Sequence, residues 1–165
     1  MNYLKIESSS LSNGLGWRVV LWLSGCSHHC PGCQNPETWD SRAGKKFTEK
    51  EKQLLIRLLK PDYIKGLTLS GGDPLFETSR EDILKLTQEI RQIYPDKDIW
   101  MYTGYSFEEI KNLELMQYID VLIDGRYLAE QRDISLAFRG SINQKIIDVR
   151  KSLKINEIVE LEPQK

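Results

Sequence analysis

Short apolar runs alternate with amphipathic segments along this chain, and that alternation restricts the folds open to it. Runs rich in branched and aromatic residues predict strands, whereas apolar residues three and four positions apart predict helices. We expect strands over 17–23, 67–69, 98–102, 119–123 and 142–149, and helices over 48–59, 80–93 and 106–115. Strands that alternate with helices favour an α/β fold with a mostly parallel sheet and right-handed crossovers.

Polar segments that contain glycine follow four of the expected strands. These segments are 24–35, 70–75, 103–105 and 124–126. Because the carboxyl ends of parallel strands lie at one edge of a sheet, we expect all four on one rim, where ligands of such sheets bind. Five or so strands are too few to close an eight-stranded barrel. We therefore expect a partial, laterally open (β/α) barrel whose rim a large partner can reach.

The composition describes a globular protein, with 40% hydrophobic and 28% charged residues. We assign residues 1–150 to a single domain and residues 151–165 to a charged C-terminal tail. Lys plus Arg (23) balances Asp plus Glu (24), for a net charge of −1, which argues against a nucleic-acid partner. The N-terminus has no basic-then-apolar signal, and the longest apolar run, 19–23, is too short to cross a bilayer. We expect a cytoplasmic protein without membrane association.

All three cysteines, Cys26, Cys30 and Cys33, lie within eight residues. A structural zinc site would need His28 or His29 from the same short loop, whereas zinc ligands usually come in two separated pairs. A redox pair formed by Cys30 and Cys33 would leave Cys26 unexplained. An iron–sulfur cluster suits three soft thiolates, and since a four-iron cluster normally takes four cysteines, one iron would stay open to an outside ligand.

In this chain a Cys-x3-Cys-x2-Cys motif follows one expected strand, and Gly71-Gly72-Asp73 follows the next. This order of motifs resembles that of the radical S-adenosylmethionine (SAM) superfamily. Within that superfamily, residues 1–148 resemble the activating proteins of anaerobic ribonucleoside-triphosphate reductases. The matching segments are Asn13-Gly14, Cys30-Pro31-Gly32-Cys33-Gln34-Asn35, Thr38-Trp39, Leu67 to Leu75, Asp98-Ile99-Trp100, Tyr102 to Tyr105, Asp124 to Tyr127, Arg139-Gly140-Ser141 and Asn143-Gln144.

Three positions depart from the patterns that this resemblance sets. Leu15 stands where the reductase activators often have proline, and Gln34 stands where they commonly have tyrosine or histidine. Gly32 stands where the wider superfamily usually has an aromatic residue that packs near the adenine of SAM. Glycine at this position fits the reductase activators, but the adenine must then find its packing elsewhere.

The resemblance implies an oxidoreductase whose catalytic centre is a [4Fe-4S] cluster held by Cys26, Cys30 and Cys33, with SAM on the open iron. It implies that one electron, from a donor such as flavodoxin, cleaves SAM into methionine and a 5′-deoxyadenosyl radical. That radical would abstract hydrogen from a glycine Cα of the large reductase subunit and so activate a glycyl-radical enzyme. The residues implied to contact the cofactor are Gly32, Cys33, Gln34, Gly71, Gly72, Asp73, Thr103, Asp124 and Arg126.

The residue types suggest how some of these positions would act. Gly71 and Gly72 would let the backbone approach the methionyl end of SAM without a β-carbon in the way, and Asp73 would accept from its ammonium group. Asp124 would hold a ribose hydroxyl, and Arg126 would face the SAM carboxylate. The alternative for each segment is an ordinary turn at a strand end.

The remaining aromatic and imidazole side chains receive structural interpretations. His28 and His29 are interpreted as exposed loop residues, and the three tryptophans of the apolar strands as core residues; these are Trp17, Trp22 and Trp100. Two other functions stay open: an activator of another glycyl-radical enzyme, such as the pyruvate formate-lyase kind, and a non-enzymatic zinc- or thiol-binding module.

Overall fold

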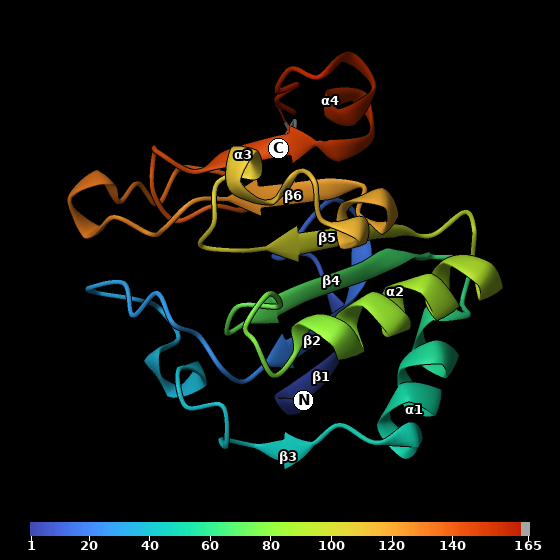
Figure 1. The fold of residues 1–165 in the computed structure, drawn as a ribbon. Helices are drawn as coiled ribbons and strands as arrows, with labels where there is room; N and C mark the ends of the chain where they lie inside the picture. The colour runs from blue at the N-terminus through green and yellow to red at the C-terminus, as the bar shows by residue number, and fades with distance from the viewer. Residues whose placement is uncertain (163–165) are drawn as a thin grey trace.

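A computed structural model describes residues 1–162 and shows an open sheet with helices packed on it (Figure 1). The strands are β1 (Asn2–Ser10), β2 (Trp17–Leu23), β3 (Lys45–Lys46), β4 (Ile64–Gly71), β5 (Asp98–Tyr102), β6 (Val121–Asp124) and β7 (Lys145–Asp148). The α-helices are α1 (Glu49–Leu59), α2 (Arg80–Ile93), α3 (Phe107–Ile110) and α4 (Val149–Ile155). Short 3-10 helices cover Pro36–Thr38, Glu114–Tyr118 and Ala129–Gln131.

The sheet is mixed, so the expectation of a mostly parallel sheet is not confirmed. Across residues 1–162 its strand order is β3-β1-β2-β4-β5-β6-β7, and only the four neighbours β2, β4, β5 and β6 run parallel. The pairs β1–β2, β1–β3 and β6–β7 are antiparallel. Residues 11–16 alone join β1 to β2, and a parallel crossover takes a dozen residues or more. The α/β class of the fold is confirmed.

One face of the sheet carries the main core. Successive strand residues point to opposite sides, so that alternate positions of β2, β4 and β5 meet the apolar faces of α1 and α2, which lie together on this side (Figure 1). The fully buried strand residues here are Val19, Leu21, Leu23, Leu67, Leu69, Ile99 and Met101. They pack with Leu55, Leu59, Ile83, Leu86 and Ile90 of the two helices.

The opposite face carries a smaller apolar cluster, formed by Trp100, Val121, Ile123 and Ile146, and a fully buried arginine. Arg18 pairs with Asp98, with 2.6 Å between Nη2 and Oδ1, and its Nε donates to Thr68 Oγ1 at 2.7 Å. Its guanidinium lies over the Trp100 ring at 5.0 Å. Burial lowers the pKa of Arg18, and the charge of Asp98 opposes that effect. A charged residue is therefore held on a face that helices α1 and α2 do not cover.

Several elements match the expected boundaries and others differ. Helix α2 and strand β5 begin and end where the sequence predicts, and a capping box of Thr48 and Glu51 starts α1. The helix expected over 106–115 ends at Ile110. Leu113 is extended, and the 3-10 helix that follows packs against α2 and buries Leu115 and Met116. Strand β1 was not expected from the sequence.

The segment expected to be a charged tail has regular structure within the described residues. Helix α4 begins at Val149, whose side chain is fully buried, and Asp148 caps it by accepting from Lys151 N. Beyond α4 the chain returns to β7, where Asp148 N donates to Val159 O at 2.9 Å and Leu161 N to Ile146 O at 2.7 Å. Residues 163–165 lie outside the described part. In residues 1–162, no helix has the length and apolar character needed to span a bilayer.

Candidate functional site

Four loops that are far apart in the sequence meet at one edge of the sheet. They follow β2, β4, β5 and β6, which are parallel neighbours and so end at the same edge. The cysteine loop, residues 24–35, and the segment 125–144 extend from this edge together (Figure 1). A cavity of about 350 Å³ lies between these loops, and residues of all four line it. The rim predicted from the sequence is therefore present.

The three cysteines line this cavity as free, half-buried thiols. A tight turn brings the last two together, since Cys33 N donates to Cys30 O at 3.0 Å, and Cys33 Sγ accepts from Asn35 N at 3.4 Å. Burial raises the pKa of Cys26. Within residues 1–162, no three His, Cys, Asp or Glu side chains come together as a site for one metal ion.

Backbone hydrogen bonds fix the start of the cysteine loop. Gly25 N donates to Thr38 O at 2.7 Å and Cys26 N donates to Trp39 O at 3.2 Å, which folds the loop back on the segment that follows it. Asp73 N donates to Gly25 O at 2.8 Å and ties the same segment to the end of β4. The position of Cys26 is thus set by main-chain contacts on both sides.

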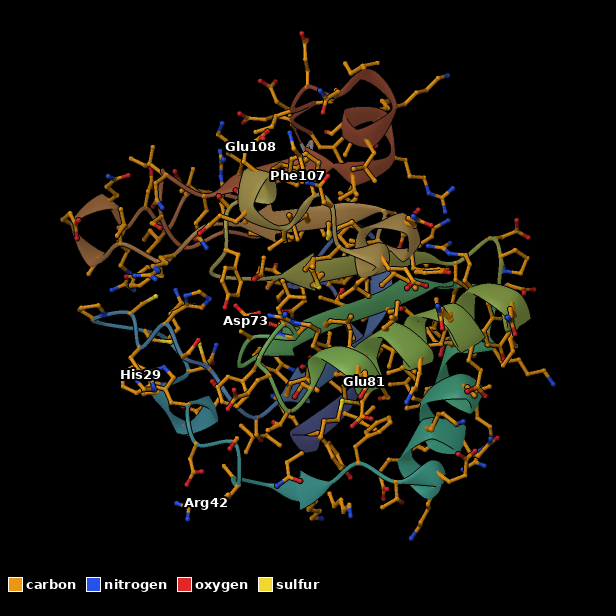
Figure 2. The ribbon with its side chains drawn as sticks, viewed as in Figure 1. His29, Arg42, Asp73, Glu81, Phe107 and Glu108 are labelled. Carbon is orange, nitrogen blue, oxygen red and sulfur yellow. The ribbon has the colours of Figure 1, made fainter. Side chains whose placement is uncertain are left out.

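Asp73 lies at the end of β4 beside the cysteine loop, on which Figure 2 labels His29. The Asp73 side chain is 3% exposed, and its carboxylate accepts from four donors of the described chain. These are Leu75 N at 2.9 Å, Thr103 Oγ1 at 2.9 Å, Gly104 N at 2.9 Å and His28 Nε2 at 2.8 Å. A carboxylate has about four lone-pair sites. In this arrangement Asp73 joins three loops and has its acceptor capacity engaged by the protein.

The two glycines before Asp73 meet a steric demand inside the protein. A β-carbon on Gly72 would lie 2.4 Å from Gly25 O, and one on Gly71 would lie 2.7 Å from Leu23 N. Gly71 also has φ +94°, a conformation that favours glycine. Both residues line the cavity as well. Because these two residues have no side chains, the ends of β2 and β4 can approach closely. This steric requirement exists whether or not a ligand binds beside them.

The other predicted cofactor residues fall into two groups. Gln34 and Thr103 line the cavity with the cysteines and the Gly-Gly-Asp segment. Asp124 and Arg126 are not among the residues that line it, although Gly125 and Tyr127 beside them are. Asp124 is 5% exposed and accepts from Phe107 N at 2.8 Å and Lys145 N at 3.1 Å, while Arg126 is exposed. The cofactor roles assigned to these residues stay predictions.

Gly32 is placed at a contact between two loops rather than on the cavity wall. It has φ +74°, and a β-carbon there would lie 3.3 Å from Ala129 Cβ and 3.7 Å from the Tyr127 ring. On the other side of that ring, a β-carbon on Gly140 would lie 3.0 Å from Tyr127 Cδ2. The cysteine loop thus packs against the segment 125–144 through glycines that leave room for Tyr127.

The expectation that both histidines are exposed is wrong for one of them. His29 is exposed and lies 4.8 Å from the Trp39 ring, but the His28 side chain is only 5% exposed. The tryptophans also differ from the expectation. Trp100 is buried as predicted, whereas Trp17 is 45% exposed, and half-buried Trp22 lines the cavity. A signal for His28 was present in the sequence only as a glycine at position 104, which leaves room for its ring.

Comparisons with known proteins agree with this arrangement. A family model described as a 4Fe-4S single cluster domain matches residues 12–147, most of the chain. The anaerobic ribonucleoside-triphosphate reductase-activating protein of Enterobacteria phage T4 is 46% identical over 146 residues, which cover 88% of this chain and 93% of that protein. The chain belongs to the family of anaerobic ribonucleoside-triphosphate reductase-activating proteins.

Two further activating proteins of this family come from bacteria. The one from Haemophilus influenzae is 46% identical over 150 residues, covering 88% of this chain and 97% of that protein. The one from Escherichia coli K12 is 42% identical over 154 residues, covering 91% of this chain and all of that protein. The similarity to these activating proteins thus extends over about nine-tenths of the chain.

Proposed function

We propose that this chain is a radical SAM enzyme that activates an anaerobic ribonucleoside-triphosphate reductase by generating a glycyl radical on its large subunit. The observation that carries the proposal is the single cavity that the three thiols share with the Gly-Gly-Asp segment and Thr103 at the ends of parallel strands. Membership in a family with a 4Fe-4S domain supports the cluster. The names of the relatives support the reductase as partner.

The residues present fit a [4Fe-4S] cluster. Three thiols on one loop line one cavity and form no disulfide. Their sulfur atoms are the soft donors that iron–sulfur clusters take. Cys26, Cys30 and Cys33 would each bind one iron, and the fourth iron would be left for the amino and carboxylate groups of SAM. When bound, the cluster and SAM supply a one-electron cleavage that yields methionine and a radical able to take hydrogen from glycine.

The protein itself would supply position and exclusion of water. The engaged carboxylate of Asp73 holds Thr103 and Gly104 in place, so that the cavity wall keeps its shape when a ligand enters. Gln34, Gly71 and Gly72 would contact SAM along this wall. Asp124 and Arg126 would reach the ribose and the carboxylate of SAM after a rearrangement of the end of β6 and of the loop that follows it, since neither lines the cavity in this structure.

The fold is consistent with a partial radical SAM barrel. The four parallel strands would form its wall, and the face without α1 and α2 would be its inside. The buried Arg18 would lie at the end of the strands opposite the rim. An open barrel of this kind would let a main-chain glycine of a partner protein approach the rim. We infer a cytoplasmic enzyme that takes its electron from a flavodoxin-like donor.

Anaerobic reconstitution with iron and sulfide tests the enzyme. The proposal expects a brown protein that, once reduced and given SAM, releases methionine and 5′-deoxyadenosine, and it expects Cys26→Ala, Cys30→Ala and Cys33→Ala to abolish this release while retaining the fold. Cleavage of SAM by any of the three variants would contradict the assignment. A colourless protein, prepared anaerobically with stoichiometric zinc, would favour the metal-binding module instead.

A further inference from the structure

His28 is a buried imidazole that the proposed mechanism does not use. Its side chain is 5% exposed although it lies in a surface loop, and its Nε2 lies 2.8 Å from Asp73 Oδ2. Because a carboxylate only accepts, Nε2 carries the hydrogen of this bond. A hydrogen bond to a charged group contributes about 1.5–3 kcal/mol in proteins, more than a neutral pair.

The ring of His28 is also held by packing on both sides of that bond. Tyr105 meets it edge-on, with 4.6 Å between ring centroids and 75° between the planes. Gly104 lies directly beneath it, since a β-carbon at that position would stand 2.4 Å from Cδ2 of His28. A single orientation of the imidazole is therefore enforced by one hydrogen bond, one aromatic contact and one missing side chain.

Asp73 contacts the cysteine loop at two points that flank Cys26. Its backbone N–H donates to Gly25 O at 2.8 Å, and its carboxylate accepts from His28. The same carboxylate accepts from Thr103 and Gly104, so it also holds the end of β5. Beyond His28 the chain turns sharply, because His29 has φ +45°. Asp73 thus holds the segment from Gly25 to His28 at both ends.

We propose that His28 is a positioning residue, which acts through Asp73 to hold the Cys26 part of the cysteine loop against the ends of β4 and β5. This tie pre-organises Cys26, and with it the turn toward Cys30, for cluster insertion and retention. The proposal rests on the function proposed above for the three cysteines. It assigns no chemical step to the imidazole, whose effect is exerted through the geometry of the loop.

Three substitutions separate the hydrogen bond from the packing. His28→Phe keeps an aromatic ring against Tyr105 and Gly104 but removes the donor. His28→Gln restores an N–H at a similar reach, and His29→Asn is the matched control, because it removes the neighbouring imidazole and asparagine tolerates positive φ.

Hydrogen–deuterium exchange of the cluster-free full chain is the first measurement. We expect backbone amides of residues 25–30 to exchange about tenfold faster in His28→Phe than in the wild type, and near the wild-type rate in His28→Gln and His29→Asn. Equal exchange in His28→Phe and the wild type would overturn the proposal, as would a His28→Gln variant as impaired as His28→Phe. Circular dichroism of each variant shows whether it folds, and a His28→Phe that fails to fold leaves His28→Gln against His29→Asn as the deciding pair.

Loss of iron to a chelator from the reconstituted proteins is the second measurement. His28→Phe is expected to lose its cluster several-fold faster than the wild type, whereas His28→Gln retains it. A wild-type chain that takes up no cluster would contradict the proposed function, and the exchange experiment would still decide on the tie. A wild type that binds its cluster beside a His28→Phe variant of equal retention would overturn the tie alone.

Discussion

Gly104 is the residue on which the orientation of His28 depends. An alanine there would place its β-carbon 2.4 Å from His28 Cδ2, so the ring must leave Asp73. We predict that Gly104→Ala lowers the free energy of unfolding of the wild type. In a His28→Ala background, where the imidazole is gone, Gly104→Ala should change the free energy of unfolding little. Urea unfolding of the four proteins measures this coupling, expected at about 1 kcal/mol or more. Strict additivity of the two single substitutions would argue against the contact.

Asp124 gives a pH-dependent test of a buried carboxylate. Burial raises its pKa above the usual 3.8, with hydrogen bonds from Phe107 N and Lys145 N opposing the effect. Because the folded-state pKa is the higher one, the folded protein binds the proton more readily than the unfolded chain. The stabilisation from this proton is fully present below the unfolded pKa and is lost as pH rises through the folded one.

The wild type should therefore gain stability relative to Asp124→Asn as pH falls from 7 toward 4. Unfolding free energies of both proteins in urea, measured across this interval, provide the comparison, since the variant subtracts the titration of every other group. A difference that stays constant with pH, or that shifts in favour of the variant, would contradict a raised pKa for Asp124.

At the level of single residues, the cysteines could be predicted because they lie close together in the sequence, and their shared loop brings them to one cavity. The partners of Asp73 could not. His28 is 45 positions away and Thr103 is 30 positions away, and no periodicity links them. A side-chain contact of that range is decided by how strands β2, β4 and β5 are ordered in the sheet.

Secondary-structure elements were predictable where their limits have strong local causes. Helix α2 has one apolar stripe and stops before Pro95, and β5 is a short apolar run between polar residues. Strand β1 escaped prediction because its sequence ends in three serines and most of its side chains are only half-buried, so alternation is weak. The antiparallel pairings of β1, β3 and β7 give the sheet its mixed character, which local sequence does not reveal.

Ser152 tests whether the segment after α4 is an integral part of this edge. Its fully buried hydroxyl donates to Asp148 O at 2.6 Å and accepts from Val159 N at 2.9 Å, which fastens the returning chain to β7. Ser152→Ala would leave the half-buried Val159 N–H without this partner and should cost about 1–2 kcal/mol in the free energy of unfolding. Denaturant unfolding provides the measurement, with the exposed Ser135→Ala as control. A Ser152→Ala variant as stable as the wild type would show that the returning segment adds nothing.

At the scale of the whole molecule, the two faces of the sheet differ in what packs on them. Helices α1 and α2 cover the apolar face, and the other face carries Arg18, Thr68 and Trp100. Thr68 Oγ1 donates to Asn13 O at 2.8 Å, so the turn between β1 and β2 is held over this second face, where Asn13 lines the cavity. The site therefore lies where side chains from this second face, the rim loops and this turn meet.

We propose that the protein generates a glycyl radical on a protein partner, and electron paramagnetic resonance detects such a radical. The reconstituted, reduced protein is mixed anaerobically with SAM and the large subunit of the anaerobic reductase, with the Cys26→Ala variant as control. We expect a glycyl-radical doublet that requires SAM and is absent with the variant. A sample in which the cluster is loaded and SAM is cleaved, yet no doublet forms on the reductase, would contradict activation of this reductase and point to a different glycyl-radical enzyme as partner.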